Sequence, residues 1–280
     1  MPVTTAQADF GVIGGSGFYS LLEDARTVAV DTPYGPPSEP LTIGMLGDRR
    51  VAFLPRHGSD HRYPPHRLPY RANLWALAAV GVRQVVASSA VGSLTPSLQA
   101  GALVLPDQLL DRTWGRPHTY SDTDNGVVHL SFADPYCPVG RAAAVRAASN
   151  AALEVTDGGT LVVINGPRFS TRAESREYQR TGASIIGMTA MPEVALAREL
   201  ALCFTSICLV TDLDAGVEAG HGVTHAEVLQ AFAANLPRMR ELLVATLAEL
   251  PERQAGCACG SALDGVPISY PLPDSYTQGH

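Results

Sequence analysis

The chain alternates short apolar runs with longer segments of helical periodicity, and this alternation restricts the folds open to it. The clearest run, Cys203–Val210, has the length of a strand and is rich in β-branched residues. The longest helical segment, Thr224–Leu250, begins with a capping-box pair, Thr224 and Glu227. Strands and helices in alternation predict an α/β fold, with a central mixed β-sheet flanked by helices. The expected strands are Phe10–Ile13, Leu41–Leu46, Val51–Leu54, Val82–Ser88, Leu161–Ile164, Ser184–Ile186 and Cys203–Val210, and the expected helices are Tyr70–Val80, Thr171–Thr181, Pro192–Ala201 and Thr224–Leu250.

Length and composition favour a single domain. Hydrophobic cores stop growing at roughly 250–300 residues, and the chain has 280 residues, of which 46% are hydrophobic and 17% charged. That composition supports a large core and argues against disorder. We expect one domain over residues 1–250 and a loosely packed tail over 251–280, where Gly, Pro and Ser are frequent.

Charge and hydropathy exclude several kinds of partner. The net charge of −7 gives no general attraction for nucleic acid or an anionic membrane. The first nine residues lack the basic and apolar regions of a secretory signal, and the apolar runs are too short to cross a bilayer. We therefore expect a cytoplasmic protein that binds neither nucleic acid nor membrane.

The five cysteines are odd in number and fit reduced thiols better than a disulfide framework. Cys257 and Cys259, in the tail, have the unusual spacing of one intervening residue. A redox pair, a metal-binding pair and two incidental thiols all fit that spacing, and we favour incidental thiols.

Polar and glycine-rich motifs follow the expected strands in the first half of the chain, where open α/β sheets place ligands. Gly14-Gly15-Ser16-Gly17 suits an anion-binding loop or a tight turn, and its spacing is neither a dinucleotide fingerprint nor a P-loop. Pro55-Arg56-His57-Gly58 fits an anion site, in which Arg56 supplies a guanidinium group and His57 an imidazole, and it also fits a surface loop. Ser88–Ser93 suits an anion-binding or simple strand-to-loop turn. His57, His61 and His66 lack metalloprotease spacing, so we expect no metal.

Three further motifs lie in the second half. In Asn165–Ser170, Phe169 suits stacking on a flat base or core packing. Met188-Thr189 comes before Glu193 on the next expected helix. Asp212 and Asp214 end the strongest strand, where desolvation and mutual repulsion raise carboxyl pKa values and favour a general acid. An Asx-type turn with a helix cap is the alternative for this pair.

In this order, the motifs jointly resemble the trimeric purine nucleoside phosphorylases, in the S-methyl-5′-thioadenosine phosphorylase branch, from about Phe10 to about Leu250. The resemblance implies a role for each matching position. The implied phosphate site is Ser16, Arg56, His57, Ser89, Ala90 and Thr189; the ribose site is Met188, His61 and His225; the base site is Phe169, Ser170, Asp212 and Asp214; and the 5′ pocket is Val228 and Leu229, with His129 from a neighbouring subunit.

The resemblance also implies the reaction. Asp212 would protonate the purine at N7 as it leaves, phosphate would attack C1′ as co-substrate, and no cofactor would be needed. Ser170 and Asp212 match the 6-aminopurine branch, which predicts 5′-methylthioadenosine or adenosine as substrate; inosine, guanosine or methylthioinosine are the alternatives. His225 departs from the methylthio pattern and leaves the 5′ group open. His129 implies a homotrimer.

Overall fold

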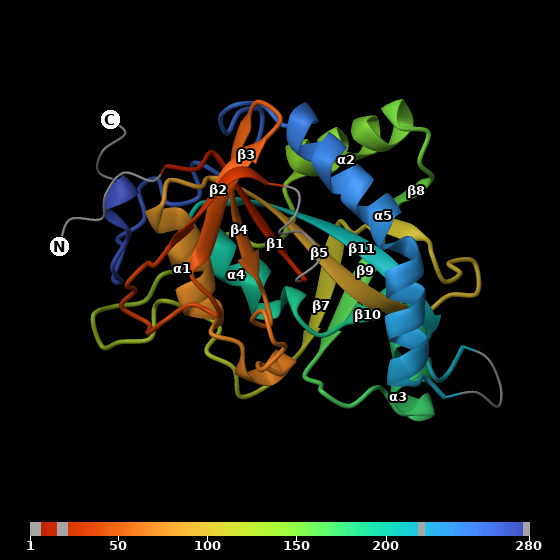
Figure 1. Cartoon of the computed structure of the whole chain (residues 1–280). Coiled ribbons are helices and arrows are strands. Elements are labelled where there is room, and N and C mark those ends of the chain that lie inside the picture. The colour runs from red at the N-terminus through yellow and green to blue at the C-terminus, as the bar shows by residue number, and fades with distance from the viewer. Residues whose placement is uncertain (1–6, 16–21, 218–221, 277–280) are drawn as a thin grey trace.

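A mixed β-sheet forms the centre of the computed structural model, which describes residues 7–15, 22–217 and 222–276 (Figure 1). Within these residues the strand order is β2-β3-β4-β1-β5-β10-β9-β7, with β11 beside β5, β6 beside β11 and β8 beside β6. The strands are β1 (Phe10–Gly14), β2 (Glu23–Val28), β3 (Leu41–Leu46), β4 (Arg49–Pro55), β5 (Gln84–Ser93), β6 (Leu103–Leu105), β7 (Gln108–Arg112), β8 (Val155–Asp157), β9 (Thr160–Ile164), β10 (Ile185–Gly187) and β11 (Cys203–Leu213). The predicted α/β fold is confirmed.

Helices cover both faces of this sheet. They are α1 (Tyr70–Ala79), α2 (Pro138–Asn150), α3 (Arg172–Arg180), α4 (Ala190–Glu199) and α5 (His225–Glu249), with short 3-10 turns η2 (Pro65–Arg67) and η3 (Asp274–Tyr276). One core packs α1 and α4 against Val85 and Ala87 of β5, and the other packs α2 and α5 against Val86. Because successive side chains of a strand point to opposite faces, these two cores lie on opposite sides of the sheet.

Two of the elements that the sequence prediction missed, α2 and β2, have weak hydrophobic patterns. Helix α2 buries only small side chains along most of its inner face, among them Ala143, Ala144 and Ala147, so its amphipathic signal is faint. Strand β2 is almost wholly exposed. The expected turn at Ser88–Ser93 is wrong, because β5 continues to Ser93 with β11 paired along its whole length.

The tail after Pro251 is packed against the domain, so the expectation of loose packing is wrong for its described part. Cys259 and Tyr270 are buried. Tyr270 donates a hydrogen bond to the Glu199 carbonyl at 2.6 Å, and the Trp75 indole N–H donates to the Pro271 carbonyl at 3.2 Å. None of the described helices is both long and apolar enough to cross a membrane.

Candidate active site

Strand β5 carries a short stretch of backbone that is paired on one edge only. On that edge, β1 pairs in parallel with Gln84–Ala87, and β10 pairs antiparallel with Gly92 and Ser93. Between the two, residues 88–91 have a strand partner among the described residues only on the opposite edge, from β11. We call residues 88–91 the β5 window. Backbone groups left open at the middle of a sheet must find other partners, such as side chains or a ligand.

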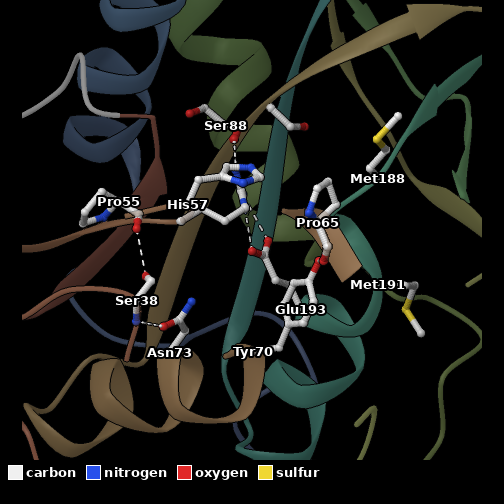
Figure 2. Close-up of polar contacts among 12 residues, drawn as sticks. Ser38, Pro55, His57, Pro65, Tyr70, Asn73, Ser88, Met188, Met191 and Glu193 are labelled. Atoms are coloured by element: carbon white, nitrogen blue, oxygen red, sulfur yellow. Dashed lines mark hydrogen bonds and ion pairs between the residues drawn. The ribbon is translucent and has the colours of Figure 1, made fainter. Parts of the chain in front are cut away.

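Arg56 fills one side of this window. It follows β4, is buried, and donates from NH1 to the Ser88 carbonyl at 2.8 Å. Its Nε and NH2 donate to the two carboxylate oxygens of Glu193 at 2.5 and 3.1 Å. Figure 2 labels Glu193 and marks the contacts at its carboxylate with dashed lines. Burial alone would lower the pKa of Arg56, but the charge of Glu193 and these bonds raise it. The bonds use three of the five guanidinium N–H donors, so Arg56 enters the site already partly neutralised.

The end of β4 is held in place by a second set of bonds. Ser38 donates from its hydroxyl to the Pro55 carbonyl at 2.8 Å, and its N–H donates to the Asn73 side-chain oxygen at 2.7 Å (Figure 2). Asn73 lies on α1, so this helix positions the residue that comes just before Arg56.

His57 is neutral in this environment. Its pKa falls to about 4, mainly because the ring is desolvated and also because the positive charge of Arg56 is close. Nδ1 lies 2.8 Å from the Tyr63 carbonyl, which can only accept, so Nδ1 carries the proton. Nε2 of the neutral ring is therefore an acceptor, so His57 would act as a donor to an anion only after taking up a proton.

The other expected phosphate residues have different environments. Ser89 is half-buried with its hydroxyl 3.5 Å from Cys208 Sγ, and Ala90 is exposed. Both belong to the β5 window. Thr189 is buried at the N-cap of α4, and its side chain makes no capping bond, which leaves the hydroxyl for another partner. Ser16 lies outside the described residues.

The sequence prediction did not name Arg116, which holds two segments of the candidate site in place. It is buried and donates to the backbone carbonyls of Asn165, Met188 and Met191 at 2.7, 2.9 and 2.5 Å. One side chain thus fixes both the loop before Phe169 and the segment before α4. Met188 packs closely on this loop, because a Cβ on Gly166 would approach its sulfur to 2.5 Å.

The Asn165–Ser170 loop leads into α3, which starts with a complete capping box of Thr171 and Glu174. Arg168 is exposed and forms a two-point ion pair with Glu174 at 2.7 and 2.8 Å, so it serves the loop's structure. Phe169 is half-buried. The Ser170 hydroxyl oxygen is buried without a hydrogen bond of ordinary geometry to any described residue.

Asp212 lies where β11 bulges, opposite Gly92 of β5. Burial raises the pKa of Asp212 to about 6, the negative charges of Asp214 and Glu227 add to this rise, and a 2.8 Å hydrogen bond from the Thr211 hydroxyl opposes it. A Cβ at position 92 would lie 2.9 Å from Asp212 Oδ1, so only glycine leaves room for the carboxyl group. The protein therefore holds a partly protonated carboxylic acid at the end of the β5 window.

Asp214 is buried more deeply, and burial raises its pKa, although the nearby Ser175 hydroxyl, the Ala215 N–H and the Ser170 hydroxyl counteract this rise. Its Oδ2 makes no hydrogen bond of ordinary geometry to a described residue. A buried hydroxyl and a buried carboxylate oxygen are thus both open beside Asp212, and unmet buried polar atoms favour a polar ligand.

The residues expected around the sugar lie at the rim. His61 is exposed and stacks on His57 with ring centroids 5.1 Å apart. His225 is exposed at the start of α5, Val228 is half-buried, and Leu229 is 54% exposed. Glu227, within the same helical turn, affects the pKa of Asp212, which places the start of α5 near the acid. His129 is exposed on a loop, and within the described part of the chain it makes no hydrogen bond to His61, His225, Val228 or Leu229.

The site thus combines a strand window, whose backbone groups are open on one edge, with two carboxyl groups whose pKa values are raised. Residues 9–248 match the family model described as the phosphorylase superfamily, and the chain belongs to that family. The resemblance to nucleoside phosphorylases expected from the motifs is confirmed.

Individual relatives match over nearly their whole length. A purine nucleoside phosphorylase of Streptomyces coelicolor is 57% identical over 95% of this chain and 98% of its own. An S-methyl-5′-thioadenosine phosphorylase of Mycolicibacterium smegmatis is 53% identical over 94% of this chain and 99% of its own. The crystal structure of a methylthioadenosine phosphorylase from an Antarctic soil metagenomic library has a TM-score of 0.88 at 38% identity, covering 98% of both chains.

Proposed function

We propose that this chain catalyses the phosphorolysis of a 6-aminopurine nucleoside, 5′-methylthioadenosine or adenosine, to adenine and a pentose 1-phosphate. The observation that carries the proposal is the pair of carboxyl groups at the end of the β5 window, half-buried Asp212 and buried Asp214, both with raised pKa values. Several relatives are named S-methyl-5′-thioadenosine phosphorylase, and one similar solved structure, from Schistosoma mansoni, holds adenine.

The base site follows from the polarity of its groups. The protonated carboxyl of Asp212 donates its proton to purine N7 as the C1′–N9 bond breaks and the bonding pair moves onto the base. This interaction strengthens only as negative charge develops, so it stabilises the transition state. The open Asp214 oxygen accepts from an exocyclic amino group and repels a carbonyl oxygen, which favours adenine. Phe169 packs on the ring, and Ser170 supplies a further polar contact.

Phosphate binds at the β5 window. The backbone of Ser89 and Ala90, the Thr189 hydroxyl and the remaining N–H donors of Arg56 surround it, and Ser16 completes the set. His57, neutral and with Nε2 free to accept, holds a phosphate hydroxyl. A phosphate oxygen then forms the new bond to C1′ on the face opposite the departing base. Phosphate is a co-substrate, and the reaction uses no cofactor.

The sugar lies between these two sites. Met188 contacts the ribose hydroxyls, and His61 and His225 lie toward its outer end. Val228 and Leu229 give an apolar wall for a 5′-methylthio group, whereas His225 can donate to a 5′-hydroxyl. In a homotrimer, the exposed loop that carries His129 would reach the neighbouring site and complete the wall.

A base-release assay tests the proposal. Purified enzyme is incubated with 5′-methylthioadenosine, adenosine or inosine, with and without phosphate, and free bases are separated by chromatography. We expect phosphate-dependent adenine release that is faster than hypoxanthine release from inosine. Faster hypoxanthine release would support the 6-oxopurine alternative, which the name of the Streptomyces relative permits. Light scattering tests the trimer.

A further inference from the structure

Four of the five cysteines meet at one point of the fold, at the opposite end of β11 from Asp212. Cys203 is the first residue of β11, Cys137 is the N-cap of α2, and Cys257 and Cys259 come from the tail. Their four sulfur atoms all lie within 4.8 Å of one another, with Cys203 and Cys257 at 3.5 Å. Cys137, Cys203 and Cys259 are buried, and Cys257 is half-buried. We call this group the four-cysteine cluster.

The spacing of the sulfurs fits one tetrahedral ion. Zinc binds thiolates at about 2.3 Å, which places the sulfurs of a tetrahedral site about 3.8 Å apart. A disulfide needs its sulfurs at about 2.05 Å and joins only two of the four. An iron–sulfur cluster has to fit several irons and sulfides between its cysteines, and four sulfurs this close leave no such space.

The surroundings of the cluster match those of thiolate ligands. The Gly140 N–H, in the first turn of α2, donates to Cys137 Sγ at 3.4 Å, and the Gln254 amide donates to Cys203 Sγ at 3.4 Å. Gln254 is itself held by the Ala201 carbonyl at 2.8 Å. Hydrogen bonds of this kind stabilise negative sulfur and orient the ligands of a metal. The described residues bring no lysine or arginine bond to these sulfurs that would neutralise them.

We propose that Cys137, Cys203, Cys257 and Cys259 bind a structural zinc ion. On binding, each thiol releases its proton to solvent and each sulfur donates an electron pair to Zn²⁺, so four protons leave and no oxidation occurs. A site with four protein ligands is closed and has no position for substrate, as in other structural zinc sites. The expectation of no metal, and of incidental thiols in the tail, is replaced by this proposal.

The ion would fasten the tail to the domain. It joins residues 257 and 259 to the start of β11 and to the start of α2, two segments far apart in sequence. Beyond the cluster, hydrogen bonds from Trp75, Arg83 and Tyr270 already hold the later part of the tail against the domain. Zinc would hold the earlier part of the tail, at residues 257 and 259.

The experiment measures zinc in the full-length protein. Wild type, Cys257→Ser/Cys259→Ser and the control Cys208→Ala are each incubated with zinc sulfate, desalted, and analysed by atomic emission. Cys208 is the fifth cysteine and lies outside the cluster, so its variant controls for the loss of a thiol. We expect about one zinc per chain in wild type and control, and loss of bound zinc in the double variant. Substitution by Co²⁺ should give the visible absorption of tetrahedral thiolate coordination.

A second measurement separates zinc from disulfides. The protein is denatured in the presence of a metal chelator and without reductant, and its free thiols are then counted with a chromogenic thiol reagent. Zinc binding predicts that all five cysteines react, whereas one or two disulfides among the four would remove two or four thiols from the count. Wild type that retains no zinc, a double variant that retains as much as the control, or a deficit of thiols would each overturn the proposal. None of these readouts depends on the catalytic activity.

Discussion

Replacing Asp212 by asparagine should make the protein more stable and far less active. The substitution keeps the size of the side chain, and the amide oxygen can still accept the 2.8 Å hydrogen bond from Thr211. It removes the charge and the transferable proton. The two effects have separate causes in the structure, so each can be measured alone.

The stability change follows from the pKa of Asp212, which the fold raises from 3.8 to about 6. A raised pKa means that the folded state holds the proton more tightly than the unfolded state, so stability is fully present below about pH 4 and is lost as pH rises through about 6. The rise of roughly two units corresponds to about 3 kcal/mol at neutral pH and above. Asp212→Asn should recover most of that free energy at pH 7.5 and less than about 1 kcal/mol at pH 4.

The catalytic change follows from the loss of the acid. General acid catalysis contributes about 10²- to 10⁴-fold, so kcat/KM for adenosine should fall by that factor at pH 6. In wild type, kcat/KM should decline about tenfold per pH unit above about 6, as the free enzyme loses the Asp212 proton. The variant should lack this decline.

Urea unfolding at pH 4 and 7.5 measures the first effect, and initial rates of adenine release from pH 5 to 9 measure the second. Asp264→Asn, at an exposed tail carboxylate, is the control and should change neither. A variant that is inactive but no more stable at pH 7.5 would refute the raised pKa. A variant that is stabilised but retains wild-type kcat/KM would show that Asp212 is not the acid.

Three more substitutions test the rest of the site. Glu193→Gln removes the negative charge that neutralises buried Arg56, so the free energy of unfolding measured in urea should drop by about 3–5 kcal/mol. The control is Glu252→Gln, at an exposed carboxylate, and an equally small drop in both variants would contradict the buried ion pair. Gly92→Ala pushes a methyl group against Asp212, and we expect a loss of about 1–3 kcal/mol in the same assay together with lower kcat; unchanged kcat would mean that the carboxyl group has room to move. His225→Val should shift the kcat/KM ratio about tenfold from adenosine toward 5′-methylthioadenosine, whereas an unchanged ratio would place His225 outside the 5′ pocket.

Local sequence patterns were enough to predict most of the fold. Strands β5 and β11 are rich in buried apolar residues. The capping box at Thr224 predicted the start of α5 within a residue, and the expected helix start at Thr171 is also within a residue of the start of α3. Helix α2 was missed because alanine contributes little to a hydrophobic pattern, even where it fills the interface with α5. Short or exposed strands such as β2 and β8 depend on their neighbours for definition and carry little signal of their own.

The chemistry of the site was harder to read in sequence. Asp212, Arg56 and Ser89 could be proposed for the site because their motifs occur together, but the bond of Arg56 to Glu193 joins residues 137 positions apart. Arg116 binds mainly backbone carbonyls, which every residue has, so no residue pattern marks it. The four-cysteine cluster was missed because only two of its members, Cys257 and Cys259, are close together in the sequence.

The β5 window has a consequence for how enzymes of this fold diverge. Its opening is produced by strand order, because β1 stops before β10 begins, and not by the side chains that occupy it. A chain that keeps this strand order therefore inherits the window and, with it, the phosphate site that we propose there, whatever nucleoside it uses. Selection on the base and the sugar can then act on Ser170, Asp214 and the start of α5 without disturbing that site. On this proposal, relatives as similar as the two named above could act on different nucleosides while keeping the same strand order.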